Sequence, residues 1–317
     1  MAVKIVTDST SDIPPQLIKE LDISVVPVYV QIGNKFLRDG MDISHDEIYD
    51  NVREGSIKTT TSQPNPQDFA DVYQKLAQDS TDIISIHLVS DLSGTYNSAL
   101  QGKEMTKSSV NIEVVDSRSL SMGLGLITIA AAKMAKEGKN MAEIMKEVKS
   151  IIPDVKIFAL LDTLKYVLQS GRLDKASSLL GNLLNVKPML TLKNGHLAPT
   201  GISRTRKKGL DCLFDIVKKA RHPYEISIVQ STNSDEAITL KEHISSLVDK
   251  SRIYLSRLGP ALGSHSGPGT LVLAIREKML KLNLENNGKE EYKKDAAQDD
   301  ISLSKFFTAH HPTPLLD

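Results

Sequence analysis

Cysteine, tryptophan and net charge are what this sequence has least of. The 317-residue chain contains one cysteine, Cys212, which excludes an intramolecular disulfide bond and a zinc site built on cysteines. Lys plus Arg number 39 and Asp plus Glu also number 39, so no global field attracts nucleic acid as a partner. Aromatic residues make up 4%, so the interior must be mostly aliphatic.

Long apolar runs are also missing. No stretch reaches the roughly 18 apolar residues that a membrane-spanning helix needs. The N-terminal MAVKIVTDSTSD lacks the apolar segment of a signal peptide and begins at once with a strand pattern. We therefore expect a cytoplasmic protein with at most transient membrane contact.

Several catalytic signatures are absent. The sequence has no GxxxxGK(S/T) phosphate loop, and the GLG at residues 123–125 does not extend to GxGxxG. Ser93 lies in DLSGT rather than in the GxSxG of hydrolase nucleophiles. No His-x-x-x-His pair or acidic triplet indicates a metal. The sequence thus predicts no cofactor, no metal and little machinery for catalysis by this chain alone.

The first half of the chain alternates strand and helix patterns. Helix start signals lie between the apolar segments, such as Ser44 three residues before Glu47 and Asn140 three residues before Glu143. This alternation predicts a mostly parallel sheet flanked by helices. The strand-like segments are residues 3–7, 24–32, 82–89, 111–116 and 155–161.

The second half indicates antiparallel pairing beside helices. Residues 187–202 form a hairpin pattern that turns at Asn194-Gly195. Residues 174–184 are a leucine-rich helix pattern, and a further helix is expected from about 204 to 220. We predict an α/β fold with an N-terminal α/β domain over residues 1–160 and a C-terminal α+β domain over 161–278. Residues 279–317 are polar and charged, and we expect them to be a mobile tail.

The segment LVSDLSGTYNSA, residues 88–99, predicts an anion site. It follows an apolar strand pattern and enters a helix through Ser93, Gly94 and Thr95. The first N–H groups of a helix have no internal partner, and the helix dipole makes that end positive. The site would suit a carboxylate or a phosphate. The alternative is a well-capped helix in which the serine acts only locally.

Hydroxyl-rich loops follow several of the predicted strands. They occupy residues 8–12, 59–66 and 115–125. Because ligands of open parallel sheets sit beyond the carboxyl ends of the strands, these loops indicate a pocket lined by hydroxyl groups. The apolar helix pattern that begins at residue 121 either leaves room for a ligand or packs tightly on the sheet.

Two further segments carry candidate functional groups. GPALGSHSGPG, residues 259–269, predicts a rigid loop that holds His265, as a functional group or a structural one. Arg204 stands at a helix start with other cations, where an anionic ligand would be favourable, although a solvated charge run is the alternative. Arg172 in SGRL would bind an anion or form a local salt bridge.

Taken together, DSTSD, TSQP, SGTYNSA, VDS, SGRL and GP-x-x-G-x-H-x-GPG resemble the DegV family, the acyl-carrying proteins of bacterial fatty acid kinase. The resemblance runs from Val3 to about Ile275. It implies a two-domain protein that holds one long-chain fatty acid in a tunnel at the domain junction. A separate ATP-dependent kinase subunit would convert the presented carboxylate to acyl phosphate. The chain would be a lipid carrier and not an enzyme by itself.

The resemblance also implies roles for single residues. Thr61 and Ser93 would hydrogen-bond the carboxylate, and Arg204 and His265 would assist the kinase reaction. Ser62, Gly94, Thr95, Ser117 and Arg172 would support the site, and the tunnel would end among Met122, Leu126, Leu180 and Leu184.

Two other functions stay open from the residues alone. One is a binding protein for a small anion such as a phosphorylated metabolite. The other is an autonomous hydrolase that uses Ser93 and His265.

Overall fold

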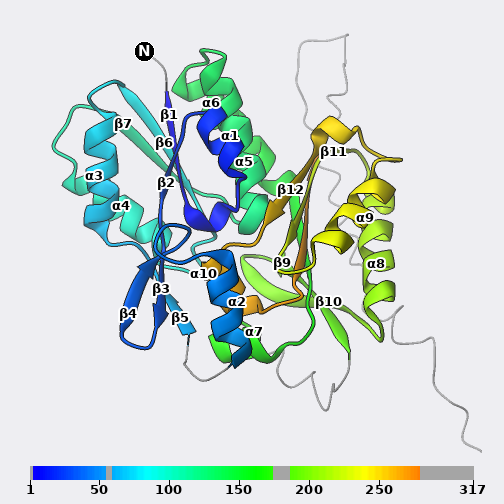
Figure 1. Cartoon of the computed structure of the whole chain (residues 1–317). Coiled ribbons are helices and arrows are strands. Elements are labelled where there is room, and N and C mark those ends of the chain that lie inside the picture. The colour runs from blue at the N-terminus through cyan, green and yellow to red at the C-terminus, as the bar shows by residue number, and fades with distance from the viewer. Residues whose placement is uncertain (1–2, 55–58, 174–185, 279–317) are drawn as a thin grey trace, which may run out of the picture. The chain divides into compact units, whose positions relative to one another are not determined.

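A parallel sheet organises the first half of the molecule. The computed structural model describes residues 3–54, 59–173 and 186–278 (Figure 1). The four strands lie in the order β2-β1-β6-β7, and every neighbouring pair is parallel, as the alternating pattern predicted. The strands are β1 (Lys4–Asp8), β2 (Ile23–Val26), β6 (Asp82–His87) and β7 (Asn111–Asp116).

Helices cover both faces of this sheet because successive strand residues point to opposite sides. On one face Ile83 packs with Phe69 and Ala99 of α3 (Pro66–Leu76) and α4 (Thr95–Met105). On the other face Ile84 packs with α5 (Ser121–Lys136) and α6 (Met141–Ile151). Short elements join these layers: η1 (Ser9–Ser11), α1 (Pro15–Glu20) and η2 (Ile152–Asp154).

The predicted helix starts are confirmed. Asn140 Oδ1 accepts from the N–H of Glu143 at 3.0 Å, and the Glu143 carboxylate accepts from the N–H of Asn140 at 3.0 Å. Ser44 and Glu47 make the same exchange at the start of α2 (His45–Glu54).

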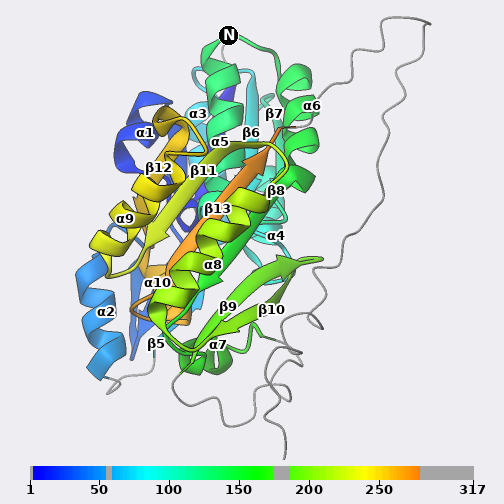
Figure 2. The same ribbon diagram turned by 90° about the vertical axis from the view of Figure 1, so that its right-hand side faces the viewer.

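A six-stranded mixed sheet organises the second half, in the order β10-β9-β8-β13-β11-β12. Only β11 and β12 pair in parallel. The helices α8 (Arg206–Lys219) and α9 (Ser234–Ile244) cover one face (Figure 2). The strands are β8 (Val155–Leu160), β9 (Lys187–Lys193), β10 (His196–Ser203), β11 (Pro223–Gln230), β12 (Ile253–Arg257) and β13 (Leu271–Glu277).

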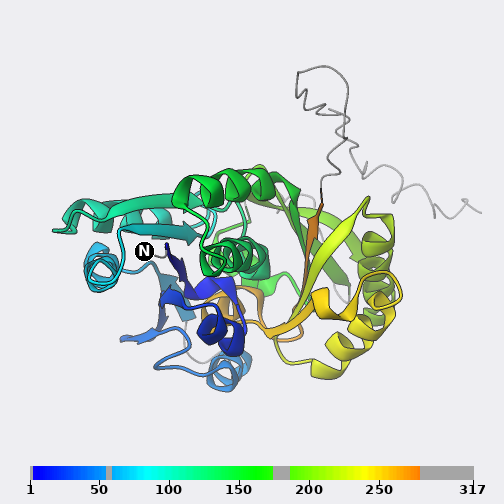
Figure 3. The same cartoon turned by 90° about the horizontal axis from the view of Figure 1, so that it is seen from above.

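Helix α5 lies between the two larger sheets (Figure 3). Its residues from Ser121 to Ala132 are buried, as predicted for a helix that is apolar on all sides. A Cβ placed on Gly125 would lie 2.7 Å from the carbonyl oxygen of Ser11. The helix therefore packs tightly. The predicted α/β fold, with a parallel sheet flanked by helices and a second region of sheet and helices, is confirmed.

Three local predictions are corrected. Residues 24–32 are two strands, because Pro27 has no N–H for a sheet ladder. The second of them, β3 (Tyr29–Ile32), pairs with β4 (Lys35–Arg38) and with β5 (Thr59–Ser62), which was expected to be a loop. Residues 260–266 form the helix α10 (Pro260–Ser266) instead of a loop. Proline suits the first helical turn, and Gly267 ends the helix with a φ of +79°.

The strand predicted at residues 155–161 belongs to the second sheet, where β8 pairs with β9 and β13. The hairpin turn at Asn194-Gly195 is confirmed, and both residues have positive φ.

The division into domains 1–160 and 161–278 stays a prediction. By its internal contacts, the chain up to Lys278 forms one compact unit. The predicted helix at 174–184 and the tail at 279–317 lie outside the described residues. Within the described ranges no helix is both long enough and apolar enough to cross a membrane.

Candidate functional site

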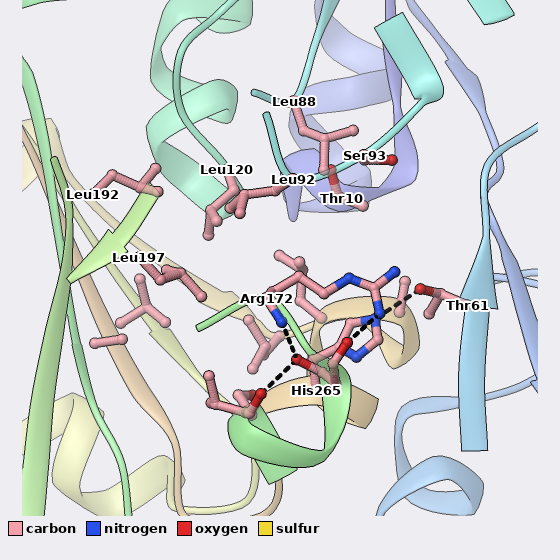
Figure 4. Close-up of a pocket in the computed structure, with 18 of the residues that line it drawn as sticks. Thr10, Thr61, Leu88, Leu92, Ser93, Leu120, Arg172, Leu192, Leu197 and His265 are labelled. Carbon is pink, nitrogen blue, oxygen red and sulfur yellow. Dashed lines mark hydrogen bonds between the residues drawn. The ribbon is translucent and has the colours of Figure 1, made fainter. Parts of the chain in front are cut away.

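A cavity of about 250 Å³ lies beyond the carboxyl ends of β1 and β6 and reaches the mixed sheet (Figure 4). A single water needs only about 10–15 Å³ of such space. The first sheet contributes the loops after β1, β6 and β7, and the second contributes β8, β9, β10 and β13. The lining residues are Thr10, Val28, Thr61, Ser62, Gln63, Leu88, Leu92, Ser93, Gly94, Leu120, Ile157, Ala159, Leu161, Val167, Ser170, Arg172, Leu190, Thr191, Leu192, Leu197, Leu258, Ala261, Leu262, His265, Ser266, Thr270 and Val272.

Thr61 and His265 meet at the polar end of this cavity. Thr61 is carried by β5 and His265 by α10, and Thr61 Oγ1 lies 2.7 Å from His265 Nε2 (Figure 4). Burial, and secondarily the positive charge of Arg172, lowers the pKa of His265 to about 4. The imidazole is therefore neutral near pH 7, with one nitrogen that donates and one that accepts.

Arg172 brings a positive charge to the same end. It follows α7 (Lys165–Ser170), and its Nη1 donates to the carbonyl oxygen of Ser170 at 2.6 Å. Among the described residues no carboxylate lies within 4.0 Å of its guanidinium nitrogens. A guanidinium can pair with an anionic ligand through two parallel hydrogen bonds.

Ser93 enters the cavity from the loop between β6 and α4. Its Oγ lies 2.9 Å from Thr95 Oγ1 and accepts from the N–H of Thr95 at 3.3 Å. Gly94 also lines the cavity, and a Cβ placed there would lie 2.7 Å from Gln63 Nε2. The glycine thus lets the β5 and β6 loops approach each other closely.

The structure brings six of the predicted site residues to the cavity: Thr61, Ser62, Ser93, Gly94, Arg172 and His265. Thr95 is buried behind Ser93 rather than in the cavity wall. Ser117 is also buried, and its Oγ donates to the carbonyl oxygen of Ser119 at 3.2 Å, which stabilises the loop after β7. Arg204 is exposed and is not part of the lining.

The residues predicted to form the end of the tunnel do not line the cavity where the structure describes them. Met122 and Leu126 are fully buried in the core around α5 and do not line the cavity. Leu180 and Leu184 lie outside the described residues. The mixed sheet instead contributes a large part of the apolar wall, including Ile157, Leu190 and Val272.

Some lining residues were not predicted. Thr10 lies in the DSTSD loop that the sequence singled out, and Asp8 fixes it by accepting from the N–H and the hydroxyl of Thr10. Gln63 lies within TSQP. The leucines of β9 and β10 had no signal, because leucine is equally common in ordinary cores.

The motifs that form this cavity match a known family. A family model described as an uncharacterised protein of the DegV family covers residues 2–278. The chain belongs to the DegV family. A DegV domain-containing protein of Caldanaerobacter subterraneus subsp. tengcongensis is 35% identical over 279 residues, which are 87% of this chain and 99% of the relative.

Solved DegV structures share the fold. A fatty-acid-binding DegV family protein from Thermus thermophilus is 31% identical, with a TM-score of 0.81 over 88% of this chain and 100% of that chain. DegV from Bacillus subtilis, a fatty acid binding protein, is 28% identical, with a TM-score of 0.79 over the same shares. Both DegV relatives thus combine this architecture with fatty acid binding.

Proposed function

We propose that this DegV protein binds one long-chain fatty acid in the cavity, with the carboxylate at the end formed by Thr61, Ser93, Arg172 and His265. One observation carries the proposal: a single cavity joins a cluster of hydroxyl and cationic groups to a wall of leucine, isoleucine and valine side chains. The fatty acid binding of the DegV relatives from T. thermophilus and B. subtilis supports it.

The energetics of such a ligand fit both ends of the cavity. Each buried CH₂ group gains roughly 0.8 kcal/mol on leaving water. A chain of about 16 carbons would therefore gain on the order of 10 kcal/mol before ordering costs. A buried carboxylate is costly unless its oxygens are satisfied. Thr61 and Ser93 supply hydroxyl donors, and Arg172 supplies a charged donor.

The second part of the proposal is presentation to a kinase subunit. The carboxylate oxygen attacks the γ-phosphorus of ATP held by that partner, the bond to the bridging oxygen breaks, and ADP leaves. His265 would orient the carboxylate from inside the cavity. Arg204 is exposed, so it would assist only from outside, beside the bound partner. We place this carrier in the cytoplasm, where the partner's ATP is available.

The hydrogen bonds of Ser93 argue against the hydrolase alternative, and the apolar wall argues against the small-anion alternative. A serine hydrolase needs a base within hydrogen-bond reach of its nucleophile. The imidazole of His265 bonds Thr61, whereas Ser93 Oγ bonds Thr95. A site for a small phosphorylated metabolite would not need the apolar wall that Leu190, Leu192 and Leu197 provide.

Native mass spectrometry of the purified protein, followed by lipid extraction, tests the proposal. We expect a stoichiometric adduct that releases a long-chain fatty acid. The delipidated protein should also take up palmitate or oleate. A mass that stays that of the bare chain after both additions would rule out the carrier function and favour the small-anion alternative.

Ser93→Ala should weaken fatty acid retention about 10- to 100-fold. The change removes one hydrogen bond to a charged group, which is worth roughly 1.5–3 kcal/mol. Displacement of a fluorescent fatty acid measures the dissociation constant. Ser98→Ala is the control, because Ser98 is a nearby serine, buried in α4, that does not line the cavity. Equal affinity of the Ser93→Ala variant and wild type would refute the role of Ser93.

His265→Gln should lower acyl phosphate formation more than it lowers fatty acid retention. Glutamine keeps a partner for Thr61 but not the imidazole, so we expect turnover with the kinase subunit to fall on the order of 10²-fold. Acyl phosphate trapped with hydroxylamine gives the rate, and the displacement assay gives retention. Unchanged turnover in this variant would exclude an assisting role for His265.

A further inference from the structure

Four leucines from two separate parts of the chain line the cavity, and two of them lie on the side away from Thr61. Leu192 and Leu197 come from the hairpin of β9 and β10 and lie on the side of the cavity opposite Thr61 (Figure 4). Leu92 and Leu120 come from the loops after β6 and β7 and line the same cavity.

The hairpin fixes Leu192 and Leu197 as a pair. The two residues are directly opposite each other in the antiparallel register of β9 and β10. Directly opposed side chains project to the same face of a sheet, about 5 Å apart. Both leucines therefore present one continuous apolar surface to the cavity.

The tip of this hairpin packs against the loops that follow β6 and β7 of the first sheet. A Cβ placed on Gly195 would lie 2.1 Å from Asp91 Oδ2 and 2.6 Å from Arg118 Nη2. Arg118 Nη1 donates to Asp91 Oδ2 at 2.5 Å, which joins the two loops. Asp91 directly precedes Leu92. The tip contact thus positions the hairpin leucines relative to Leu92 and Leu120.

The two loops are also tied together behind the leucines. The N–H of Val89 donates to the carbonyl oxygen of Ser119 at 2.8 Å, and Ser90 Oγ donates to Asp116 Oδ2 at 2.6 Å. These hydrogen bonds therefore fix the positions of the two loops that carry Leu92 and Leu120.

We propose that Leu192 and Leu197 form the end wall of the cavity and set the longest acyl chain that the protein accepts. This inference rests on the proposed binding of a fatty acid. Packed protein interiors resist the insertion of extra methylene groups. A chain that reaches this wall must displace the leucine pair or leave part of its length in water. The size of the side chain at position 197 then controls chain length.

The test measures dissociation constants of the delipidated full chain for saturated fatty acids of increasing length, from laurate to arachidate. One pocket methylene changes binding by about 10-fold or more. Leu197→Ala should therefore raise the affinity of acids longer than the wild-type optimum by at least about 10-fold relative to the optimum acid. Leu197→Phe should shift the optimum to a shorter acid.

Ile202→Ala is the matched control. Ile202 lies on the same strand, is 41% exposed and does not line the cavity, so its removal should leave the chain-length profile unchanged. If the wild type binds fatty acids and the Leu197→Ala and Leu197→Phe profiles both coincide with it, the end wall is refuted while the proposed function stands. If the wild type binds none of the acids, the proposed function fails and this inference fails with it.

Discussion

The hydrogen bond between Thr61 and His265 joins residues that are 204 positions apart in the chain. It is formed inside a cavity, where burial holds the pKa of the imidazole down to about 4. A neutral imidazole accepts or donates without bringing a second charge beside Arg172. The carboxylate of a bound ligand would therefore face one full positive charge and several neutral donors.

The depressed pKa of His265 makes the stability of the ligand-free protein depend on pH. Between pH 4 and 6.5 the unfolded state binds a proton at this residue and the folded state does not. Stability therefore rises with pH across this window, and we expect His265 to contribute a loss on the order of 2 kcal/mol between pH 7.5 and pH 5.

Urea unfolding of wild type and His265→Gln at both pH values measures this difference. The variant should lose less stability at pH 5 than wild type, and His196→Gln, at an exposed position, should behave as wild type. A pH dependence that is identical in His265→Gln and wild type would contradict the buried neutral imidazole.

At the scale of elements, α10 positions the polar end of the cavity. Asp12 Oδ1 accepts from the N–H of Gly259 at 2.8 Å, and the Tyr49 hydroxyl donates to the carbonyl oxygen of Leu258 at 3.0 Å. Asp39 Oδ1 lies 3.4 Å from the N–H of Ala261. The N-terminal half of the chain thus holds the start of the helix whose last turn carries His265.

We expect the Asp12 carboxyl to make the protein less stable as pH rises. Burial, helped by the nearby Asp39 and Asp8, raises its pKa from 3.8 to about 8, against the opposing hydrogen bonds from Ser121 and Gly259. Because the folded-state pKa is raised, stability is greatest below pH 3.8 and falls steadily as pH rises from there to about 8. Asp12→Asn removes this dependence, so the variant should already be more stable than wild type at pH 6, and its advantage should be larger at pH 9.

Thermal unfolding at the two pH values checks the prediction for Asp12. Asp12→Ala should instead cost roughly 1–3 kcal/mol at both, because it leaves the N–H of Gly259 unsatisfied. Asp79→Asn, at an exposed position, is the control. A difference between Asp12→Asn and wild type that stays constant from pH 6 to 9 would show that the carboxyl is ionised throughout.

At the scale of the whole molecule, the two larger sheets share one core around α5. That core includes Ile84 and Val115 of the first sheet together with Val229 and Val272 of the second. A buried ion network adds to it: Glu225 Oε1 accepts from Lys133 of α5 at 3.1 Å, and Glu225 Oε2 accepts from Arg276 of β13 at 2.8 Å. Burial by itself would raise the pKa of Glu225, but these two cations lower it.

We therefore expect the described part of the chain to unfold in one cooperative transition. Glu225→Gln removes the shared anion and should lower the free energy of unfolding by roughly 2 kcal/mol in that single transition. Urea unfolding followed both by circular dichroism and by release of a bound fluorescent fatty acid measures it. Glu242→Gln, at an exposed position of α9, is the control. Two separate transitions would instead support independent domains at the predicted boundary.

The local elements were predictable because their causes are local. The strand, loop and helix around Ser93, the turn at Asn194-Gly195 and the cap at Asn140 each depend on residues within a few positions of one another. The family resemblance rests on the same short motifs, and Thr61 and Ser93, which it assigned to one site, both line the cavity.

The assignments that failed locally depended on packing. Residues 260–266 were expected to be a loop because of their glycines and prolines, but contacts from Asp12 and Asp39 favour a helix there. Met122 and Leu126 were expected at the tunnel end, and the position of α5 between two sheets buries them in the core.

The sequence by itself determined the alternating sheet and five polar residues that line the cavity, and it shows no metal-binding or nucleotide-binding motif. Only the tertiary structure decided that β8 joins the second sheet, that Arg204 stays outside the cavity, and that the leucines of β9 and β10 line its apolar end. The reason is that a short motif determines the backbone geometry of a few neighbouring residues. A cavity instead depends on how segments that are distant in the sequence pack against each other.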